Sequence, residues 1–171
     1  MSEEIQSFLV GTIFLDLLLL VALAVSISRG AGNSGLVARR AMARVGAVPL
    51  LVQSLHLLEE WRTGFHLRFP ELLGLHPWSE GLFLSFNLGW IGIWMLSLPG
   101  VRIGLRASLF PLWFLGVVSI ANGVAHPLLS VVSGGYFPGL WTSPLCGVAG
   151  FMLLRAMAQF TGGQRPEPKA A

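Results

Sequence analysis

The chain has 171 residues, of which 54% are hydrophobic and only 11% are charged. Ordinary soluble domains carry about 25% charged residues. This composition therefore excludes an ordinary soluble domain and predicts an integral membrane protein. The net charge of +3 comes from arginines that lie between apolar stretches rather than in one basic patch, which argues against a nucleic-acid partner. The excess of arginine over the single lysine, Lys169, indicates a bacterial source.

A helix that crosses a membrane needs about 20 apolar residues, and five stretches of the chain approach or exceed that length. They cover residues 7–28, 43–65, 80–99, 107–130 and 140–160. The sequence therefore predicts an all-α integral membrane bundle of five transmembrane helices. We expect residues 1–160 to form this single domain and residues 161–171 to form a flexible cytoplasmic tail.

The basic residues are expected to lie mostly on one side of this bundle. Only Arg62 and Arg68 fall on the other side. Because cytoplasmic segments carry an excess of Lys and Arg, the N-terminus is predicted to lie outside and the C-terminus in the cytoplasm. The expected location is the inner (cytoplasmic) membrane of the cell, as a multi-pass protein.

The first apolar stretch carries one charged residue, Asp16, near its middle. An ionisable side chain is costly in the hydrocarbon and marks a functional site by default. A hydrogen-bonded packing residue is the alternative interpretation of Asp16. The functional interpretation places it among the residues that contact a substrate.

The second apolar stretch ends in the sequence His56-Leu57-Leu58-Glu59-Glu60. This places an imidazole and two carboxylates at membrane depth or at its outer boundary, where charges need a functional reason. On a helix, Gln53, His56 and Glu60 share one face, with Glu59 on its flank. The pattern predicts a polar helix face whose imidazole and carboxylate groups can share a proton or a metal ion.

The segment 66–80 contains several polar residues and is predicted to be an outer loop. The third apolar stretch follows it and places Asn87, Trp90 and Trp94 on one helix face. Asn87, about two turns from the start of this stretch, is expected to lie in the outer half of the membrane.

The fourth apolar stretch carries a second polar stripe that includes Ser119, Asn122 and His126. At a rise of about 1.5 Å per residue, Asn122 and His126 reach the same outer level as His56. The two polar stripes are therefore predicted to face each other and to form one site.

We expect this site to contain catalytic and substrate-binding residues. The predicted catalytic residues are His56, Glu59, Glu60, Asn122 and His126. The predicted substrate-binding residues are Asp16, Gln53, Asn87, Trp90 and Tyr136. A divalent metal ion is an open alternative, with His56, Glu60 and His126 as its ligands, because imidazole and carboxylate together suit Zn, Fe or Mn. The spacing matches neither the HExxH nor the ExxH metal motif, and hydrogen-bonded structural histidines remain the other interpretation.

Three short motifs resemble a bacterial integral-membrane family that is named for its HXXEE motif. They are His56-x-x-Glu59-Glu60, Asn122-x-x-x-His126 and Tyr136-Phe137-Pro138-Gly139. The resemblance extends from about residue 45 to residue 160. It implies that these residues belong to one site, and it implies no reaction, since the family has no assigned activity.

Three functions fit the pattern. The first is a small membrane enzyme that uses the His/Glu cluster for acid/base chemistry, with or without a metal ion, on a lipophilic molecule such as an isoprenoid or another lipid. The second is a non-catalytic subunit that binds a pigment, haem or lipid within a larger membrane complex. The third is proton-coupled transport. The expected partners are a membrane lipid or lipophilic small molecule, with membrane-complex subunits or a second copy of the chain as further possibilities.

Overall fold

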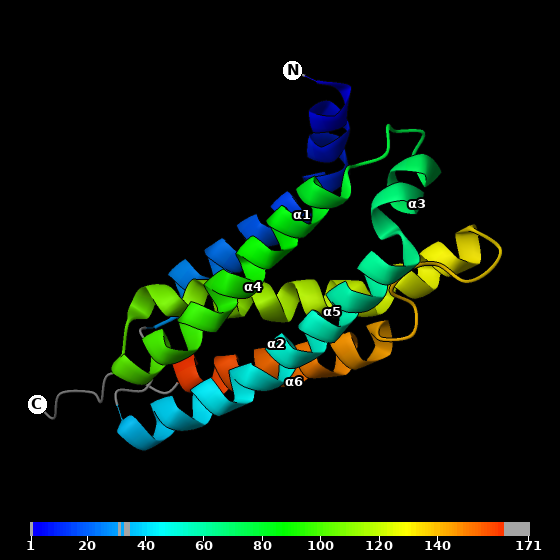
Figure 1. Cartoon of the computed structure of the whole chain (residues 1–171). Coiled ribbons are helices and arrows are strands. Elements are labelled where there is room, and N and C mark those ends of the chain that lie inside the picture. Colours follow the sequence, from blue (N-terminus) through cyan, green and yellow to red (C-terminus); the bar gives the residue numbers. More distant parts are fainter. Residues whose placement is uncertain (1, 31, 33–34, 163–171) are drawn as a thin grey trace, which may run out of the picture.

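The computed structural model describes residues 2–30, 32 and 35–162, and within them the chain folds into six α-helices and one short 3-10 turn, without strands (Figure 1). The elements are α1 (Glu3–Ser28), α2 (Leu36–Thr63), α3 (Phe65–Leu72), α4 (Glu80–Ile103), η1 (Arg106–Ser108), α5 (Leu109–Val132) and α6 (Ser143–Gly162). All helices except α3 are long and apolar enough to cross a membrane, α5 being counted together with η1. The five predicted spanning helices are therefore confirmed as helices of the required length and polarity.

Several helix ends differ from the ends of the predicted apolar stretches. Helix α2 begins at Leu36, well before the predicted start at residue 43, because backbone hydrogen bonding continues after the side chains become polar. At the start of α4 the side chain of Ser79 accepts a hydrogen bond from the amide of Leu82 at 3.3 Å, which is the usual capping contact. Of the predicted tail, residues 163–171 lie outside the described residues.

Helix α3 was not predicted, since the segment 66–80 was expected to be a loop. The chain turns at Gly64, whose φ of 78° lies in the left-handed region that glycine adopts readily. Phe65 and Phe69 then share one helix face and pack with Trp78 near the end of α2. The ring of Phe65 lies 5.6 Å from the ring of His126. Helix α3 thus covers the polar groups that α2 and α5 bring together.

Helix α5 is the centre of the bundle, since it packs against α1, α2, α4 and α6. Its contact with α6 is the most extensive, and glycines make that contact close. A Cβ atom added to Gly123 would lie only 2.6 Å from the Cα of Gly147. Small residues let membrane helices approach in this way. The close α5–α6 packing fixes the segment that joins these helices, and that segment contacts the site.

Candidate functional site

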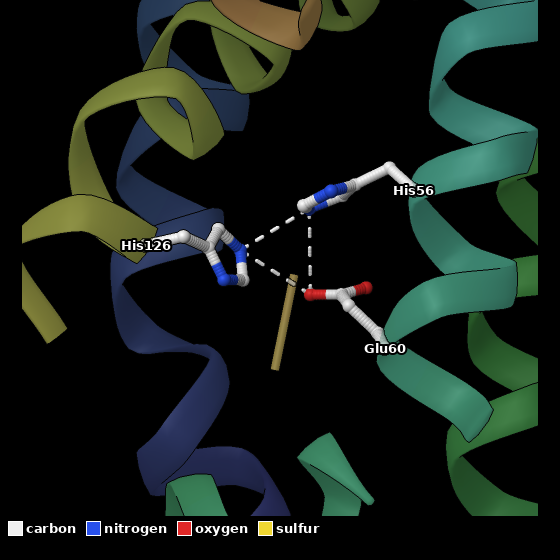
Figure 2. Close-up of side chains that lie close together, drawn as sticks. All are labelled: His56, Glu60 and His126. Carbon is white, nitrogen blue, oxygen red and sulfur yellow. Dashed lines mark hydrogen bonds and ion pairs between the residues drawn. The ribbon is translucent and has the colours of Figure 1, made fainter. Parts of the chain in front are cut away.

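Three side chains from two helices meet in the interior, and we call them the His–Glu–His cluster: His56 and Glu60 of α2, and His126 of α5 (Figure 2). The two Nε2 atoms lie 3.1 Å apart. Oε1 of Glu60 lies 3.6 Å from Nε2 of His56 and 3.3 Å from Nε2 of His126. The residues are only 0%, 7% and 3% exposed, respectively. The structure thus brings together the three residues that were predicted as a metal-ligand set.

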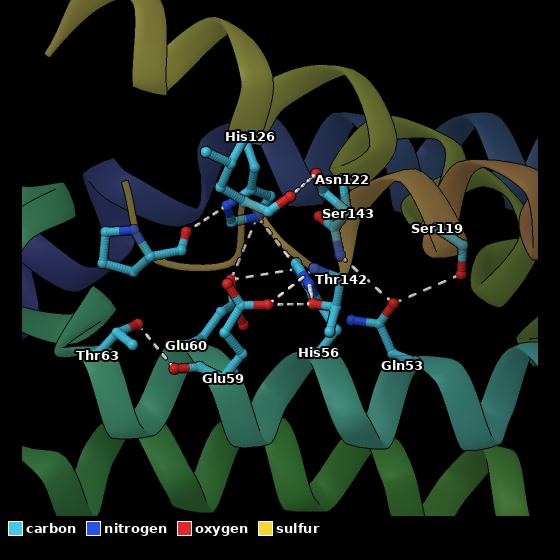
Figure 3. A network of polar contacts seen from close by, with 12 residues as sticks. Gln53, His56, Glu59, Glu60, Thr63, Ser119, Asn122, His126, Thr142 and Ser143 are labelled. Atoms are coloured by element: carbon cyan, nitrogen blue, oxygen red, sulfur yellow. Dashed lines mark hydrogen bonds and ion pairs between the residues drawn. The ribbon is translucent and has the colours of Figure 1, made fainter. Parts of the chain in front are cut away.

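The other ring nitrogen of each histidine is held by the segment that joins α5 to α6. Nδ1 of His126 lies 2.6 Å from the carbonyl oxygen of Pro138. Nδ1 of His56 lies 2.7 Å from Oγ1 of Thr142, whose hydroxyl donates to Oε2 of Glu59 at 2.6 Å (Figure 3). These contacts orient both imidazoles so that their Nε2 atoms point toward Glu60. Pro138 and Thr142 were not among the predicted site residues.

Gly139 lies directly against both imidazoles. Its φ of 89° is left-handed, and an added Cβ atom would lie 2.5 Å from Nδ1 of His126 and 2.8 Å from Cε1 of His56. Only glycine satisfies both the backbone conformation and the available space. Its position in the Tyr136-Phe137-Pro138-Gly139 motif is the sequence signal that could have assigned it to the site.

Glu59, which was predicted to be catalytic, lies outside the cluster. Its carboxylate accepts hydrogen bonds from the hydroxyl of Tyr136 at 2.8 Å, the amide of Trp141 at 3.0 Å, and the amide and hydroxyl of Thr142 at 2.9 and 2.6 Å. One residue along a helix corresponds to a rotation of about 100°, so Glu59 faces the α5–α6 connection while Glu60 faces the cluster. The geometry makes Glu59 an anchor for that connection rather than a partner of Glu60 in proton transfer.

Tyr136, which was predicted to bind substrate, belongs to the same anchor and does not line the cavity. Burial raises the pKa of its phenol, and the hydrogen bond to Glu59 acts in the same direction. The hydroxyl therefore remains a donor to Glu59 at neutral pH. Its role is to fix the position of the carboxylate.

A cavity of about 130 Å³ lies beside the cluster and is walled partly by Glu60 and His126. Ten of its 21 lining residues are Phe or Trp, contributed by α1, α3, α4, α5 and the segment before α4. Along α4 the lining runs from Phe83 to Trp94, a rise of about 16 Å. The cavity is thus elongated and aromatic, with the ionisable groups at one place in its wall.

Four of the other predicted residues also line this cavity: Gln53, Asn87, Trp90 and Asn122. The amide of Asn122 donates to Oε1 of Gln53 at 3.4 Å, and the amide of Asn87 donates to the carbonyl of Phe83 at 2.9 Å. Asn122 therefore sits beside the cluster rather than within it. Its position suits orientation of a bound molecule more than proton transfer.

Asp16, the remaining predicted substrate-binding residue, does not reach the site. Its side chain does not line the cavity, although Thr12 and Leu15 of the same helix do. Helix α1 packs on the bundle through the face that carries Thr12, Leu15 and Ala22, and Asp16 points away from it. Within the described part of the chain no hydrogen bond or ion pair reaches its carboxylate. The expected substrate contact is not supported.

Chemically, the cluster offers three lone-pair atoms around one point at the wall of an apolar cavity. Such atoms can pass a proton among themselves or hold a cation together. No family model, curated protein or solved structure matches this chain. The resemblance to the HXXEE family thus stays an expectation based on the motifs, and the site must be interpreted from its own geometry.

Proposed function

We propose that this chain is a small integral-membrane enzyme that carries out acid/base chemistry on a lipophilic, isoprenoid-like or lipid-like molecule. One observation carries the proposal: Glu60 and His126 belong both to the buried His–Glu–His cluster and to the wall of the aromatic cavity. A general acid or base must lie within hydrogen-bond reach of the proton that it transfers. A molecule in this cavity would meet that condition at Glu60 and His126.

The roles follow from position. Glu60 and His126 would exchange protons with the substrate, and His56, with its Nε2 atom 3.1 Å from that of His126, would relay or tune them. Gln53 and Asn122 would orient a polar group of the substrate from the same wall. A proton-transfer isomerisation or cyclisation requires no further groups.

The lining favours a lipophilic substrate. Aromatic side chains dominate it, and the faces of their rings can stabilise a developing positive charge. The indole N–H of Trp94 has no hydrogen-bond partner among the described residues, so it is available to an acceptor on a bound molecule. Helix α1 packs mainly on α5, whereas α4 packs mainly on α2 and α5. The cavity therefore lies between two helices, α1 and α4, that share little backbone contact, and we propose lateral entry from the bilayer between them.

An activity assay with a mixture of lipids tests the proposal for any lipid substrate. The purified chain would be reconstituted with a bacterial membrane-lipid extract and analysed over time by mass spectrometry. We expect one lipid class to change with the wild type and with Glu71→Gln, an exposed carboxylate that neither belongs to the cluster nor lines the cavity, and to remain unchanged with Glu60→Gln or His126→Ala. Equal conversion by all variants, or no conversion by the folded wild type, would contradict an enzymatic role of the cluster.

We also propose an orientation in the inner membrane of a bacterium, with the N-terminus outside. Arg39 packs against the backbone of Gly104, so the first turns of α2, with several arginines, lie on the same side of the bundle as the α4–α5 connection, which is flanked by Arg102 and Arg106. Cytoplasmic segments carry such an excess of basic residues. A reporter fused to the C-terminus should be active only in the cytoplasm. Activity restricted to the periplasm would reverse the proposed orientation.

A non-catalytic subunit of a membrane complex is the second candidate, and Asp16 is the observation that favours it. A carboxylate near the middle of a spanning helix, without a partner among the described residues, is costly in hydrocarbon, and a neighbouring subunit could supply a hydrogen-bond donor. Haem or pigment ligation by the cluster is disfavoured, because the two Nε2 atoms lie 3.1 Å apart and leave no space for a macrocycle between them. Cross-linking from a photoreactive residue at Asp16 in intact membranes would detect such a subunit.

A further inference from the structure

The hydrogen bonds around the two histidines determine which ring nitrogen carries the proton. Nδ1 of His126 lies 2.6 Å from the carbonyl oxygen of Pro138. A carbonyl oxygen has no proton to donate, so Nδ1 of His126 must be the donor. In the neutral imidazole the other nitrogen, Nε2, then carries a lone pair.

The same conclusion holds for His56 by one further step. Nδ1 of His56 lies 2.7 Å from Oγ1 of Thr142, and that hydroxyl donates its single proton to Oε2 of Glu59 at 2.6 Å. With its proton used, the hydroxyl can only accept from His56. Nδ1 of His56 is therefore protonated, and its Nε2 atom also carries a lone pair.

The centre of the cluster is consequently a triangle of acceptors. Two imidazole lone pairs and a carboxylate oxygen of Glu60 face one another across 3.1, 3.3 and 3.6 Å, in an almost fully buried place. Acceptors packed together without a donor repel one another and lose the hydrogen bonds that water would give. One added proton can bridge only one edge of the triangle well. A metal cation satisfies all three atoms at once.

We propose that the His–Glu–His cluster binds one divalent transition-metal ion of the zinc type, with Nε2 of His56, Nε2 of His126 and Oε1 of Glu60 as ligands. Zinc bonds to histidine nitrogen and carboxylate oxygen measure about 2.0–2.2 Å, so ligand atoms in a tetrahedral site are separated by about 3.3–3.6 Å. The edges of the triangle, 3.1 to 3.6 Å, agree with that range to within about 0.2 Å. The ligands need almost no movement to accept the ion.

The surroundings of the cluster have the other features of a metal centre. Metal-binding histidines donate their second ring N–H to a carboxylate, a backbone carbonyl or water. The carbonyl of Pro138 is such a partner for His126, and for His56 the hydroxyl of Thr142 takes this place and passes the hydrogen bond on to the carboxylate of Glu59. Gly139 keeps the joining segment against both rings. The Glu59 anchor thereby gains a purpose, because it fixes the tautomer of His56.

The number of ligands points to a catalytic rather than a structural metal. Structural zinc sites use four protein ligands, whereas catalytic sites use three and leave one position for water or substrate. Two of the ligands, Glu60 and His126, line the aromatic cavity, so the open position would face it. Water bound to such an ion has a pKa of about 7, so with the ion present this water, rather than Glu60 and His126 themselves, would act as the base or nucleophile toward the substrate. This chemical role rests on the proposed function, whereas the metal site itself rests on the geometry alone.

The test uses the full chain purified in mild detergent. The protein would be stripped with a chelator, reloaded with Zn²⁺ or Co²⁺ alone, freed of unbound ion and analysed for metal content. We expect one ion per chain and a Co²⁺ visible spectrum of four-coordinate type in the wild type. His56→Ala, His126→Ala and Glu60→Gln should lose the bound ion. Thr142→Val removes no ligand but deletes the hydroxyl that links Nδ1 of His56 to Glu59, and it should bind the ion about 10 to 100 times more weakly.

Matched controls distinguish this site from adventitious binding. His76→Ala removes an exposed histidine between α3 and α4, and Glu71→Gln removes an exposed glutamate near the end of α3. Both variants should keep one ion per chain. A folded wild type that takes up neither ion, or uptake that is equal in the cluster variants and the wild type, would overturn the proposal. Because the wild-type Co²⁺ spectrum reports coordination directly, the test does not depend on the folding of any variant.

The outcome is separable from that of the lipid assay. A bound ion without lipid conversion would leave the metal site standing and remove the enzymatic proposal. Lipid conversion that depends on Glu60 but persists after complete removal of metal would contradict a catalytic metal and support the proposal of metal-free acid/base chemistry.

Discussion

Glu59 and Glu60 are neighbours on helix α2, yet their surroundings are opposite. The carboxylate of Glu59 accepts four hydrogen bonds from the α5–α6 connection. The carboxylate of Glu60 faces the Nε2 atoms of two imidazoles, whose Nδ1 atoms are hydrogen-bonded to Pro138 and Thr142. A satisfied carboxylate contributes to stability, whereas an unsatisfied one costs stability and persists for a chemical reason. The comparison supports a structural role for Glu59 and the proposed functional role for Glu60.

The largest effect on stability is expected from Gly139→Ala, because this change pushes the anchored connection away from both imidazoles. The added methyl group would overlap the rings of His126 and His56, and we expect a loss of about 2–5 kcal/mol from overpacking and the left-handed backbone together. Thermal unfolding in detergent would measure it. Gly134→Ala is the matched control, since Gly134 has a φ of 69° but nothing within 4 Å. It should lose only about 1–2 kcal/mol, and equal losses would show that contact with the imidazoles is unimportant.

Removal of the satisfied carboxylate is expected to have the next largest effect. Glu59→Ala would leave the amides of Trp141 and Thr142 and the hydroxyl of Tyr136 without their acceptor. We expect a loss of about 2–3 kcal/mol, moderated by partial exposure of the site. An unfolding midpoint of Glu59→Ala equal to that of the wild type would contradict the anchoring role of Glu59.

A smaller effect is expected when one donor to Glu59 is removed. Tyr136→Phe deletes the 2.8 Å hydrogen bond from the phenol and leaves the three donors of Trp141 and Thr142 in place. The expected loss is about 0.5–1.5 kcal/mol, measured by thermal unfolding beside Glu59→Ala. Tyr136→Phe in the Glu59→Ala background should then add almost nothing, because the two residues act through the same contact. Full additivity of the two losses would mean that they act independently.

The smallest effect on stability is expected at the unsatisfied carboxylate. Glu60→Gln replaces an acceptor with an amide that can donate to the Nε2 lone pairs, so the metal-free protein should be as stable as the wild type or more stable by up to about 1 kcal/mol. Parallel unfolding of the two chelator-treated proteins measures this difference. A large loss in Glu60→Gln would make the cluster a structural network.

The fold and part of the site could be predicted from the sequence because they follow from periodic patterns. Apolar stretches indicate the spanning helices, and the helical repeat places His56 with Glu60 and Asn122 with His126 on facing stripes. Helix α3 escaped prediction, since eight residues that include Arg68 and Glu71 resemble a polar loop.

The remaining differences involve single side chains in surroundings that a local pattern does not specify. Helix α1 is apolar on nearly every side, so its lone Asp16 does not reveal which face is buried. Glu59 bonds to backbone amides more than 80 positions away along the chain, and no local pattern reports such a contact. The pairing of Tyr136 and Thr142 with Glu59, and of Pro138 with His126, became apparent only with the packing of α5 against α6.

The functional role of Glu60 is tested most sharply by thermal unfolding of the chelator-treated wild type and Glu60→Gln, each with and without added Zn²⁺. A ligand that binds only the folded state stabilises it by about 2.7 kcal/mol at a concentration 100 times its Kd. We expect Zn²⁺ to raise the midpoint of the wild type and to leave Glu60→Gln unchanged, while the two metal-free proteins unfold at similar temperatures. Two results together would contradict a metal-binding role of Glu60 and make its carboxylate structural. The metal-free Glu60→Gln protein would unfold far below the metal-free wild type, and Zn²⁺ would leave the midpoints of both proteins unchanged.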